Sequence, residues 1–411
     1  MPEPVHVIGA ARTDFKRNLR KEGRTIAYLI VEAGRAAIAD AGIEPDALDA
    51  GVVGNFAAGQ FTGQQHLGAF LTEIDPGLRG KPTLHVEAAC ASGSVAVLTA
   101  AQQIIGGLCE AVLVVGVEQQ KTMPPLEGAE VLGAAEDYAN EREQFGDFMF
   151  PKLFAHIAQR YAERHELTEE QLAMVAVKNY AHASLNPQAQ MRDAELTLKA
   201  ASAESEHNPR IAPPLKVSDC SQITDGAAAV VLCSERLWRR LGGKGGARLT
   251  GYGHTTDYLP LERKDIPEFT VTRKAVAQAF AMAGIEPRDL DGAEVHDCFS
   301  ISEIVAYEII GLAARGMGAE LLASGATALP SVRDRFAGRH PAFSLPVNPG
   351  GGLMGDGHPV GATGVRQVAE AFVQLSGRAG ERQIDGAGRY LTFNMGGSFT
   401  TNVAMVWESA V

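Results

Sequence analysis

Cys90 lies where a predicted strand meets a predicted helix, and this position could make its thiol a nucleophile. Residues 83–86 read as a strand, and the small and apolar residues that follow the cysteine read as a helix. A thiol near a helix N-terminus meets free backbone N–H groups and the positive end of the helix dipole, both of which favour the thiolate. The alternative is a buried structural cysteine, the more usual role of a cysteine taken alone.

Two histidines and a second cysteine could complete a centre around this thiol. His358 lies in a glycine-rich segment, residues 350–364, and the proline that follows it fixes the start of a helix. His296 and Cys298 belong to a His-Asp-Cys-Phe sequence. A thiol beside an imidazole is a common arrangement for nucleophilic catalysis. The glycine-rich segment could instead hold a phosphate, but it matches neither the Walker A nor the dinucleotide-binding pattern.

A third glycine cluster, Asn-Met-Gly-Gly-Ser at 394–398, ends another predicted strand. The backbone N–H of Gly396, together with that of Cys90, could form an oxyanion hole. A tight turn without a catalytic role is an equally good interpretation of this cluster.

An internal repeat predicts the helices and strands that carry these residues. Residues 41–56 align with residues 283–298 through a shared Ala-Gly-Ile-Glu-Pro and a shared Leu-Asp, and each copy follows an amphipathic helix. A weaker match aligns the Cys90 segment with the His358 segment. We therefore predict two copies of one α/β unit related by a pseudo-twofold axis, with Cys90 and His358 close together at the seam. Only the second copy carries the His-Asp-Cys-Phe residues. This asymmetry favours an active site on one side of the duplicated core.

This repeat predicts the domain organisation of an α/β protein. The first half covers residues 1–118 and is completed by about 218–245, and the second half covers 246–411. Residues 119–217 differ in composition and are predicted to form an inserted domain over the core. One helix of the insertion is expected to begin with a capping box at Thr168.

Bulk composition excludes several classes of function. The chain has 411 residues and a net charge of -12, which argues against nucleic acid or an anionic membrane surface as a partner. No apolar stretch approaches the ~20 residues that span a bilayer, and the N-terminus does not read as a signal peptide. The five cysteines are dispersed and never form a Cys-x-x-Cys pair, so we expect no disulfide framework, no zinc knuckle and a cytoplasmic location.

The motifs resemble those of the thiolase superfamily over essentially the whole chain. Residues 87–93 resemble the nucleophile segment, residues 221–230 resemble the strand that returns to the first domain, and residues 357–364 match the motif Gly-His-Pro-x-Gly-Ala-Thr-Gly. The sequence at 296–299 is similar to the His-Asp-Cys-Phe motif of sterol-carrier-protein-2-type thiolases, where ordinary thiolases carry Asn-Glu-Ala-Phe. Residues 177–187 also resemble that branch.

The resemblance implies a duplicated αβαβα five-layer core with an inserted loop domain. It also implies an acyl-CoA acyltransferase, which cleaves a 3-ketoacyl-CoA with coenzyme A or runs the reverse Claisen condensation through a cysteine acyl-enzyme. Coenzyme A is then a substrate that lies along the insertion, and neither a metal nor a permanently bound cofactor is required. Members of the family are usually homodimers or homotetramers.

The same resemblance implies roles for individual residues. Ordinary thiolases have a second catalytic cysteine in a Cys-x-Gly motif, where this chain reads Asn-Met-Gly, so the role passes to Cys298. His358 would ionise Cys90, and His296 and His358 would hold the thioester oxygen. The residues that bind coenzyme A are not assigned; Arg210 and Lys216 are candidates for its phosphates, although we favour a solvated surface position for both.

Three other interpretations remain open at this stage. A thiolase-fold aldolase would cleave side chains of acyl-CoA, but such relatives have lost the nucleophilic cysteine that stands here as Cys90. A ketoacyl synthase would carry a histidine loop of another pattern in place of residues 296–299. A partner-dependent subunit or scaffold would work beside a small OB-fold zinc protein.

Overall fold

A mixed sheet runs through the whole molecule. The computed structural model describes residues 3–335, 341 and 343–410, and within this part the main sheet has nine strands in the order β3-β2-β4-β7-β1-β8-β11-β10-β9. Its strands are β1 (Val5–Arg12), β2 (Ala50–Gly54), β3 (Thr83–Val86), β4 (Ala111–Gln119), β7 (Asp225–Ser234), β8 (Ala247–Thr256), β9 (Gly292–Glu294), β10 (Arg389–Gly396) and β11 (Thr401–Ser409).

The two halves of this sheet repeat one pattern of pairing. Strand β2 is parallel to β4, and β4, β7 and β1 follow one another antiparallel; in the same way β9 is parallel to β10, and β10, β11 and β8 are antiparallel. Val347 even forms a parallel bridge to Ala293, where β3 pairs with β2 in the first half. Antiparallel pairing of β1 with β8 joins the halves. The duplication predicted from the sequence is therefore a structural duplication.

The sequence repeat forms the same local structure twice. Helices α1 (Ile26–Ala41) and α10 (Thr270–Ala283) both end at a glycine in the left-handed conformation, with φ of 64° at Gly42 and 70° at Gly284. Glycine adopts this conformation without the steric cost that a Cβ brings. A short 3₁₀ turn that begins at Pro45 or Pro287 then leads into β2 or β9.

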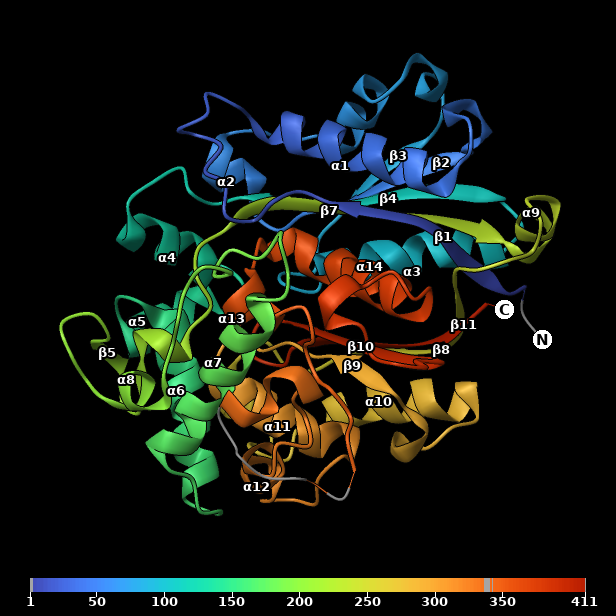
Figure 1. The fold of residues 1–411 in the computed structure, drawn as a ribbon. Helices are drawn as coiled ribbons and strands as arrows, with labels where there is room; N and C mark the ends of the chain where they lie inside the picture. Colours follow the sequence, from blue (N-terminus) through green and yellow to red (C-terminus); the bar gives the residue numbers. More distant parts are fainter. Residues whose placement is uncertain (1–2, 336–340, 342, 411) are drawn as a thin grey trace.

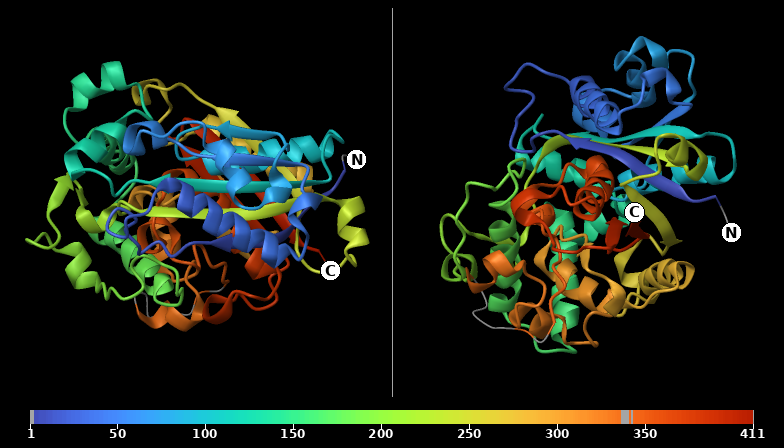
Figure 2. Two further views of the ribbon diagram at one scale, coloured as in Figure 1. Left: turned by 90° about the horizontal axis from the view of Figure 1, so that it is seen from above. Right: turned by 45° about the vertical axis from the view of Figure 1, so that its right-hand side comes forward.

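Helices and sheet halves alternate as layers, as the resemblance implied. Helices α3 (Ser92–Ile105) and α14 (Thr363–Leu375) lie between the two halves of the sheet, α1 covers the first half, and α10 and α11 (Ser300–Ile310) cover the second (Figure 1). The right-hand view of Figure 2 shows the same order of layers from another side. The central pair thus has sheet on both sides.

Glycines let the two central helices touch through their backbones. A Cβ on Gly364 would lie 2.2 Å from the backbone nitrogen of Ser94, and one on Gly93 would lie 2.8 Å from the carbonyl oxygen of Gly361. Real Cβ atoms do not come this close to other atoms, so larger residues would push the helices apart. The contact places the N-termini of α3 and α14, one from each half, at the same point.

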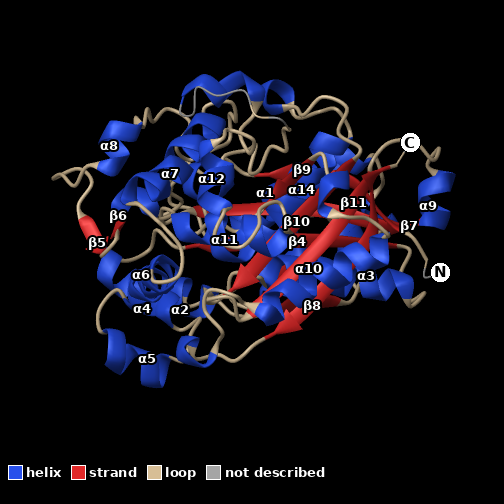
Figure 3. Ribbon diagram, turned by 90° about the horizontal axis from the view of Figure 1, so that it is seen from below, coloured by secondary structure: helices blue, strands red, loops and turns tan. Residues whose placement is uncertain are grey.

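The segment between β4 and β7 lies at one side of the layers, shown in green in Figure 1 and seen from below in Figure 3. The predicted capping box is present at the start of α7, since the Thr168 side chain accepts from the N–H of Gln171 and the Gln171 side chain accepts from the N–H of Thr168. No described helix is long and apolar enough to cross a membrane. The other elements are α2 (Ala58–Thr62), α4 (Pro125–Gly133), α5 (Tyr138–Phe145), α6 (Met149–Ala162), α7 (Glu169–Ala183), α8 (Leu198–Ser202), β5 (Arg210–Ala212), β6 (Leu215–Lys216), α9 (Glu235–Arg240), α12 (Gly318–Ala323) and α13 (Gly352–Asp356).

Candidate active site

A tight turn between β3 and α3 holds Cys90. Ala89 has a φ of +49°, which is uncommon for a residue with a side chain. The Ser92 hydroxyl donates to the Ala89 carbonyl (2.6 Å) and accepts from the N–H of Ala88 (2.9 Å). On the other side Gly396 is pressed so closely against the turn that a Cβ there would lie 2.2 Å from the Ala88 oxygen. The sulfur is therefore fixed just before the first turn of α3.

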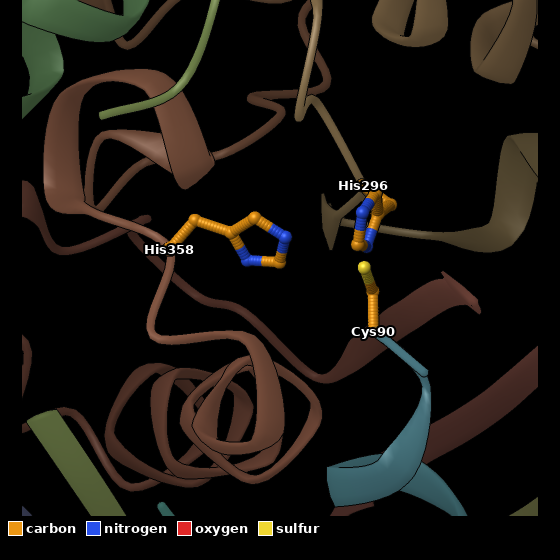
Figure 4. A group of neighbouring side chains, drawn as sticks. All are labelled: Cys90, His296 and His358. Atoms are coloured by element: carbon orange, nitrogen blue, oxygen red, sulfur yellow. The ribbon is translucent and has the colours of Figure 1, made fainter. Parts of the chain in front are cut away.

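Cys90, His296 and His358 form one buried cluster. The Cys90 sulfur and one ring nitrogen of each histidine all lie within 4.8 Å of one another. The two rings meet edge to face, with centroids 5.1 Å apart and an interplanar angle of 87°. Figure 4 shows the sulfur directed at the His296 ring and the His358 ring extending toward both. Three residues that the sequence analysis singled out, from distant segments, thus share one site.

Burial dominates the electrostatics of Cys90. Loss of solvent raises the pKa of its thiol to about 12, although the backbone N–H of Gly397 and its own N–H bond to the sulfur and lower the pKa. The expectation that the helix end would favour a thiolate is therefore wrong for the resting site, because desolvation of the charge outweighs the nearby N–H groups. Ionisation of Cys90 needs a base in contact with it.

His358 presents an unprotonated nitrogen to the site. The Thr363 hydroxyl donates to the Pro359 carbonyl (3.4 Å), so its oxygen accepts from Nδ1–H of His358 at 2.6 Å. This tautomer leaves Nε2 with a free lone pair. Burial, and next the charge of Arg366, lower the pKa of the ring to about 3, so the imidazole is neutral.

His296 presents a proton instead. The Ser94 hydroxyl donates to the amide oxygen of Asn394 (3.0 Å), which leaves the amide nitrogen of Asn394 to donate to Nδ1 of His296 at 2.8 Å. The proton of the neutral ring then sits on Nε2, a buried atom for which the described residues offer no partner. Burial, followed by the charges of His358 and Arg366, holds the pKa of His296 well below its ordinary value. The site thus holds one imidazole acceptor and one unsatisfied imidazole donor.

Cys298 lines the same cavity as Cys90. Its sulfur lies 3.8 Å from the Ser302 hydroxyl, and burial together with the nearby Cys90 raises the pKa of its thiol well above the ordinary value. Its neighbour Asp297 accepts the backbone N–H groups of Leu353 (2.7 Å) and Met354 (3.2 Å). Asp297 therefore ties the His-Asp-Cys-Phe segment to the glycine-rich segment that carries His358.

The cavity in front of the sulfurs has a volume of about 170 Å³ and a largely apolar wall. It reaches Cys90, Cys298 and His358. Helices α4 and α6 and the segment before β7 supply much of the wall, and its larger side chains include Phe56, Leu132, Phe148, Phe150, Ile223 and Phe299. A pocket of this kind can hold an apolar chain that leads to a reactive sulfur.

Several polar residues that support the site were not predicted from the sequence. Helix α7, which lies between β4 and β7 in the chain, extends Lys178 into the core, where it pairs with Glu303. Asn179 donates to both Glu303 and Asp297 at 2.7 Å. Lys178 and Glu303 are fully buried. The sequence did hold one indication of these contacts, since Lys178 and Asn179 directly follow the apolar run Val175–Val177. A charge on an apolar helix face needs a buried partner. The link between Asn394 and His296 was also missed.

The expected surface position of Lys216 is wrong. Lys216 is fully buried and lies 3.1 Å from the Glu169 carboxylate, which also takes Arg210 at 2.8 Å. Arg210 further contacts Glu204 at 3.0 Å. Both cations are thus already compensated by carboxylates, and neither is an obvious partner for the phosphates of coenzyme A.

Comparison with known proteins identifies the family. The chain matches the family description "Thiolase, N-terminal domain" over residues 5–236 and "Thiolase C-terminal domain-like" over residues 253–409. Together these matches cover the duplicated fold and every residue of the buried cluster. The chain belongs to the thiolase family and is a thiolase-type, CoA-related enzyme.

Individual relatives carry more specific names. Acetyl-CoA acetyltransferase of Methanothermobacter thermautotrophicus is 37% identical over 98% of this chain and 99% of its own length. Human sterol carrier protein 2 is 32% identical over 95% of this chain and 70% of its own length. Among solved structures, the "Ltp2-ChsH2(DUF35) aldolase" matches with a TM-score of 0.81 and 24% identity over 100% of this chain and 98% of that chain, which shows a shared fold.

Proposed function

We propose that this chain cleaves 3-ketoacyl-CoA with coenzyme A, or runs the reverse Claisen condensation, through an acyl group carried on Cys90. The observation that supports this most is the pair of neutral histidines beside the thiol, one ready to accept a proton and the other ready to donate a hydrogen bond. These are the two tasks that thioester chemistry on a buried cysteine requires.

In the first step the proton of the Cys90 thiol passes to Nε2 of His358. The sulfur then attacks the 3-keto carbonyl of the substrate and forms a tetrahedral intermediate. Its oxyanion lies at the nucleophile turn, where the N–H of Cys90 and the Gly396–Gly397 turn serve as the oxyanion hole. Contact of Gly396 with the turn and of the Gly397 N–H with the sulfur supports this assignment.

In the second step the bond between the α-carbon and the keto carbon breaks, and its electron pair forms the enolate of acetyl-CoA. Nε2–H of His296, together with the now protonated His358, holds the enolate oxygen. Cys298 gives its proton to the α-carbon, and acetyl-CoA leaves while the acyl group stays on Cys90. Condensation runs the same proton transfers in reverse.

In the third step coenzyme A takes the acyl group. The Cys298 thiolate accepts the proton of the incoming CoA thiol, whose sulfur attacks the acyl carbon on Cys90. Collapse of this intermediate releases acyl-CoA, and the Cys90 thiolate recovers its proton from His358. We propose that the pantetheine arm reaches both sulfurs through the apolar cavity, alongside the inserted domain assigned to residues 119–217.

The aldolase alternative has one observation in its favour, the fold shared with a solved aldolase. Both Cys90 and Cys298 stand in the cavity of this chain, and an aldolase has no use for a covalent acyl carrier. The solved aldolase, as its name states, also contains a DUF35 component. The test below therefore includes the case in which this chain needs a small OB-fold zinc protein as its partner.

The test is turnover of acetoacetyl-CoA with coenzyme A by the purified chain, followed as formation of acetyl-CoA. We expect turnover in the wild type and in the control Cys109→Ala, whose thiol lies outside the cavity, and none in Cys90→Ala. Brief exposure to acetyl-CoA should add one acetyl mass at Cys90. Release of an aldehyde or ketone without consumption of coenzyme A would instead indicate the aldolase, and turnover only with an added OB-fold protein would indicate a complex.

A further inference from the structure

We propose that the unacylated active site binds Zn²⁺ through Cys90, His296 and His358, and that bound zinc blocks the enzyme reversibly. Binding itself follows from the side-chain cluster alone. Two further parts of the proposal rest on the proposed function: zinc inhibits the enzyme, and acylation of Cys90 prevents zinc binding.

The donor set and its spacing fit zinc. One thiolate and two imidazoles are ligands that zinc prefers, whereas Mg²⁺ and Ca²⁺ prefer oxygen. Zinc bonds of about 2.3 Å to sulfur and about 2.0 Å to nitrogen place ligand atoms roughly 3.5 Å apart in a tetrahedron. The three ligand atoms lie within 4.8 Å of one another. Shifts of about 1 Å in the side chains therefore bring these atoms to the spacing of a zinc site. Cys90 and His358 line the cavity, so a water molecule can reach the ion as its fourth ligand.

An unsatisfied buried nitrogen points to a missing ligand at this place. Nε2 of His296 has no hydrogen-bond partner among the described residues, and only 1% of the residue is exposed. A buried polar group without a partner costs free energy, which an ion at this position would offset. Within the described part of the chain, these three residues are also the one cluster of His, Cys, Asp or Glu side chains close enough to share an ion.

The residues behind the histidines can support this binding. Nδ1–H of His358 already donates to Thr363, the kind of second hydrogen bond that orients a metal-binding imidazole and leaves Nε2 for the ion. For His296 the proton must move to Nδ1, which requires the Asn394 amide to turn over and present its oxygen. The Ser94 hydroxyl tolerates this change, since it can accept from the amide nitrogen as well as donate to the oxygen.

Nearby charges act in both directions. Glu118 and Glu136 are buried near Cys90, and their negative charge raises the pKa of its thiol and favours a cation at the sulfur. Burial raises the pKa of both carboxyl groups, to about 7 for Glu118, so this attraction grows as the pH rises. Arg366 acts on both histidine rings and opposes a cation, but its charge is paired with Glu294 and Asp356. An ion that replaces the thiol proton by a metal–thiolate bond is therefore attracted by these two carboxyl groups where they are ionised.

Zinc in this position removes both partners of the first catalytic step. It occupies the sulfur that attacks and the His358 nitrogen that accepts the proton. Acylation converts the Cys90 sulfur into a thioester, which is a poor metal ligand, so zinc and the acyl group exclude each other. The resting enzyme is the form that zinc captures.

Binding is tested without substrate, by competition between the metal-free protein and a chromogenic zinc indicator. We expect about one Zn²⁺ per chain in the wild type and in the control Cys109→Ser, and an affinity at least tenfold lower in Cys90→Ser, His296→Asn and His358→Asn. Co²⁺ in place of zinc should give a thiolate-to-metal charge-transfer band in the wild type and none in Cys90→Ser. Mg²⁺ should not compete.

A second measurement avoids dependence on variants that fail to fold. Zn²⁺ should protect Cys90 of the wild type from alkylation by iodoacetamide while Cys109 stays reactive, as read from peptide masses, and prior acetylation by acetyl-CoA should abolish zinc uptake. Zinc binding that persists in both Cys90→Ser and His296→Asn, or alkylation of Cys90 unaffected by zinc, would overturn this proposal. An enzyme that turns over but does not bind zinc refutes this inference alone. A chain that binds zinc but shows no turnover in its metal-free form refutes the proposed function alone.

Discussion

The amide nitrogen of Asn394 donates to Nδ1 of His296 at 2.8 Å, and this contact decides which nitrogen of His296 carries the proton. The Thr363 hydroxyl does the opposite at His358, where it accepts from Nδ1–H. Two chemically identical rings, 5.1 Å apart, are thereby held in complementary tautomers. Asn394 is in this sense a positioning residue, since it acts through His296.

Replacing Asn394 by Asp should reverse the tautomer of His296. The carboxylate accepts a hydrogen bond from Nδ1–H, which leaves Nε2 without a proton to offer the enolate oxygen. Loss of one donor to a developing oxyanion costs about 10²–10³ in kcat, so we expect a fall of about 100-fold with little change in KM. Steady-state kinetics of Asn394→Asp and of Asn394→Ala, which leaves the tautomer free, provide the comparison. Equal activity of Asn394→Asp and wild type would contradict this role.

Replacing Cys298 by Ala should separate acylation from carbon–carbon bond chemistry. Cys90 and His358 remain, and the CoA thiolate can leave without taking a proton from Cys298, so acetyl-CoA should still acetylate Cys90, although more slowly. Thiolysis and condensation should fall by about 10²–10⁴-fold, because the proton donor for the α-carbon is lost. Intact-protein mass reports acylation, and steady-state assays report turnover. Ser302→Ala, which removes only the hydroxyl 3.8 Å from the Cys298 sulfur, is the control and should keep most activity. An enzyme without Cys298 that turns over normally would rule out its role in proton transfer.

Replacing Gly364 by Ala should weaken the seam between the halves. The added Cβ would lie 2.2 Å from the backbone nitrogen of Ser94, which cannot move independently of its helix. We expect the free energy of unfolding to fall by about 1–3 kcal/mol or the chain to become insoluble. Urea unfolding measures this change. Gly388→Ala is the matched control, because its Cβ would meet nothing nearer than 3.6 Å.

Removing the charge of Lys178 alone should destabilise the fold more than removing the charges of both Lys178 and Glu303. In Lys178→Met, Glu303 is left buried without its cation, which typically costs about 3–5 kcal/mol. The double variant with Glu303→Gln should recover part of that loss, since no uncompensated charge remains. Urea unfolding of both variants gives the comparison, and a double variant less stable than Lys178→Met would contradict the argument.

Stability should depend on pH through His182. Its Nδ1 bonds to the Asn348 carbonyl (2.8 Å) and its Nε2 accepts the N–H of Leu329 (3.0 Å); burial, and next the charge of Lys178, lower the pKa to about 3. The unfolded ring binds a proton below its ordinary pKa of 6.5, so acid favours the unfolded state between pH 6.5 and 3. At pH 5 this group should cost about 2 kcal/mol relative to pH 7.5. His182→Gln should lack this part of the acid sensitivity in urea unfolding at the two pH values, and an unchanged pH dependence would disprove the assignment.

Local signals account for what the sequence predicted well. Gly42 and Gly284 end helices in a conformation that glycine favours, and the Pro turns that follow are equally local, so the repeat could be recognised without the fold. Cys90 and His358 lie in motifs whose residue types indicate a nucleophilic thiol and an imidazole base. From the repeat alone, their meeting at the seam could also be anticipated.

Other features depend on the whole fold and left little trace in the sequence. Asn394 and His296, or Lys178 and Glu303, are partners only because separate elements pack together. The high pKa of Cys90 likewise follows from its burial in the folded chain, and not from its neighbours in the sequence. The boundaries of the inserted domain, the homo-oligomer and the cytoplasmic location stay predictions.

Cys90 comes from the first half of the duplicated chain, whereas His296, Cys298 and His358 come from the second, and the glycine contact between α3 and α14 sets how these groups face one another. Neither half therefore contains a working centre by itself. Selection for activity must therefore act on backbone atoms at the junction as well as on the reacting side chains. A misplacement of about 1 Å there can cost about 100-fold in rate in an enzyme whose catalytic residues are all intact.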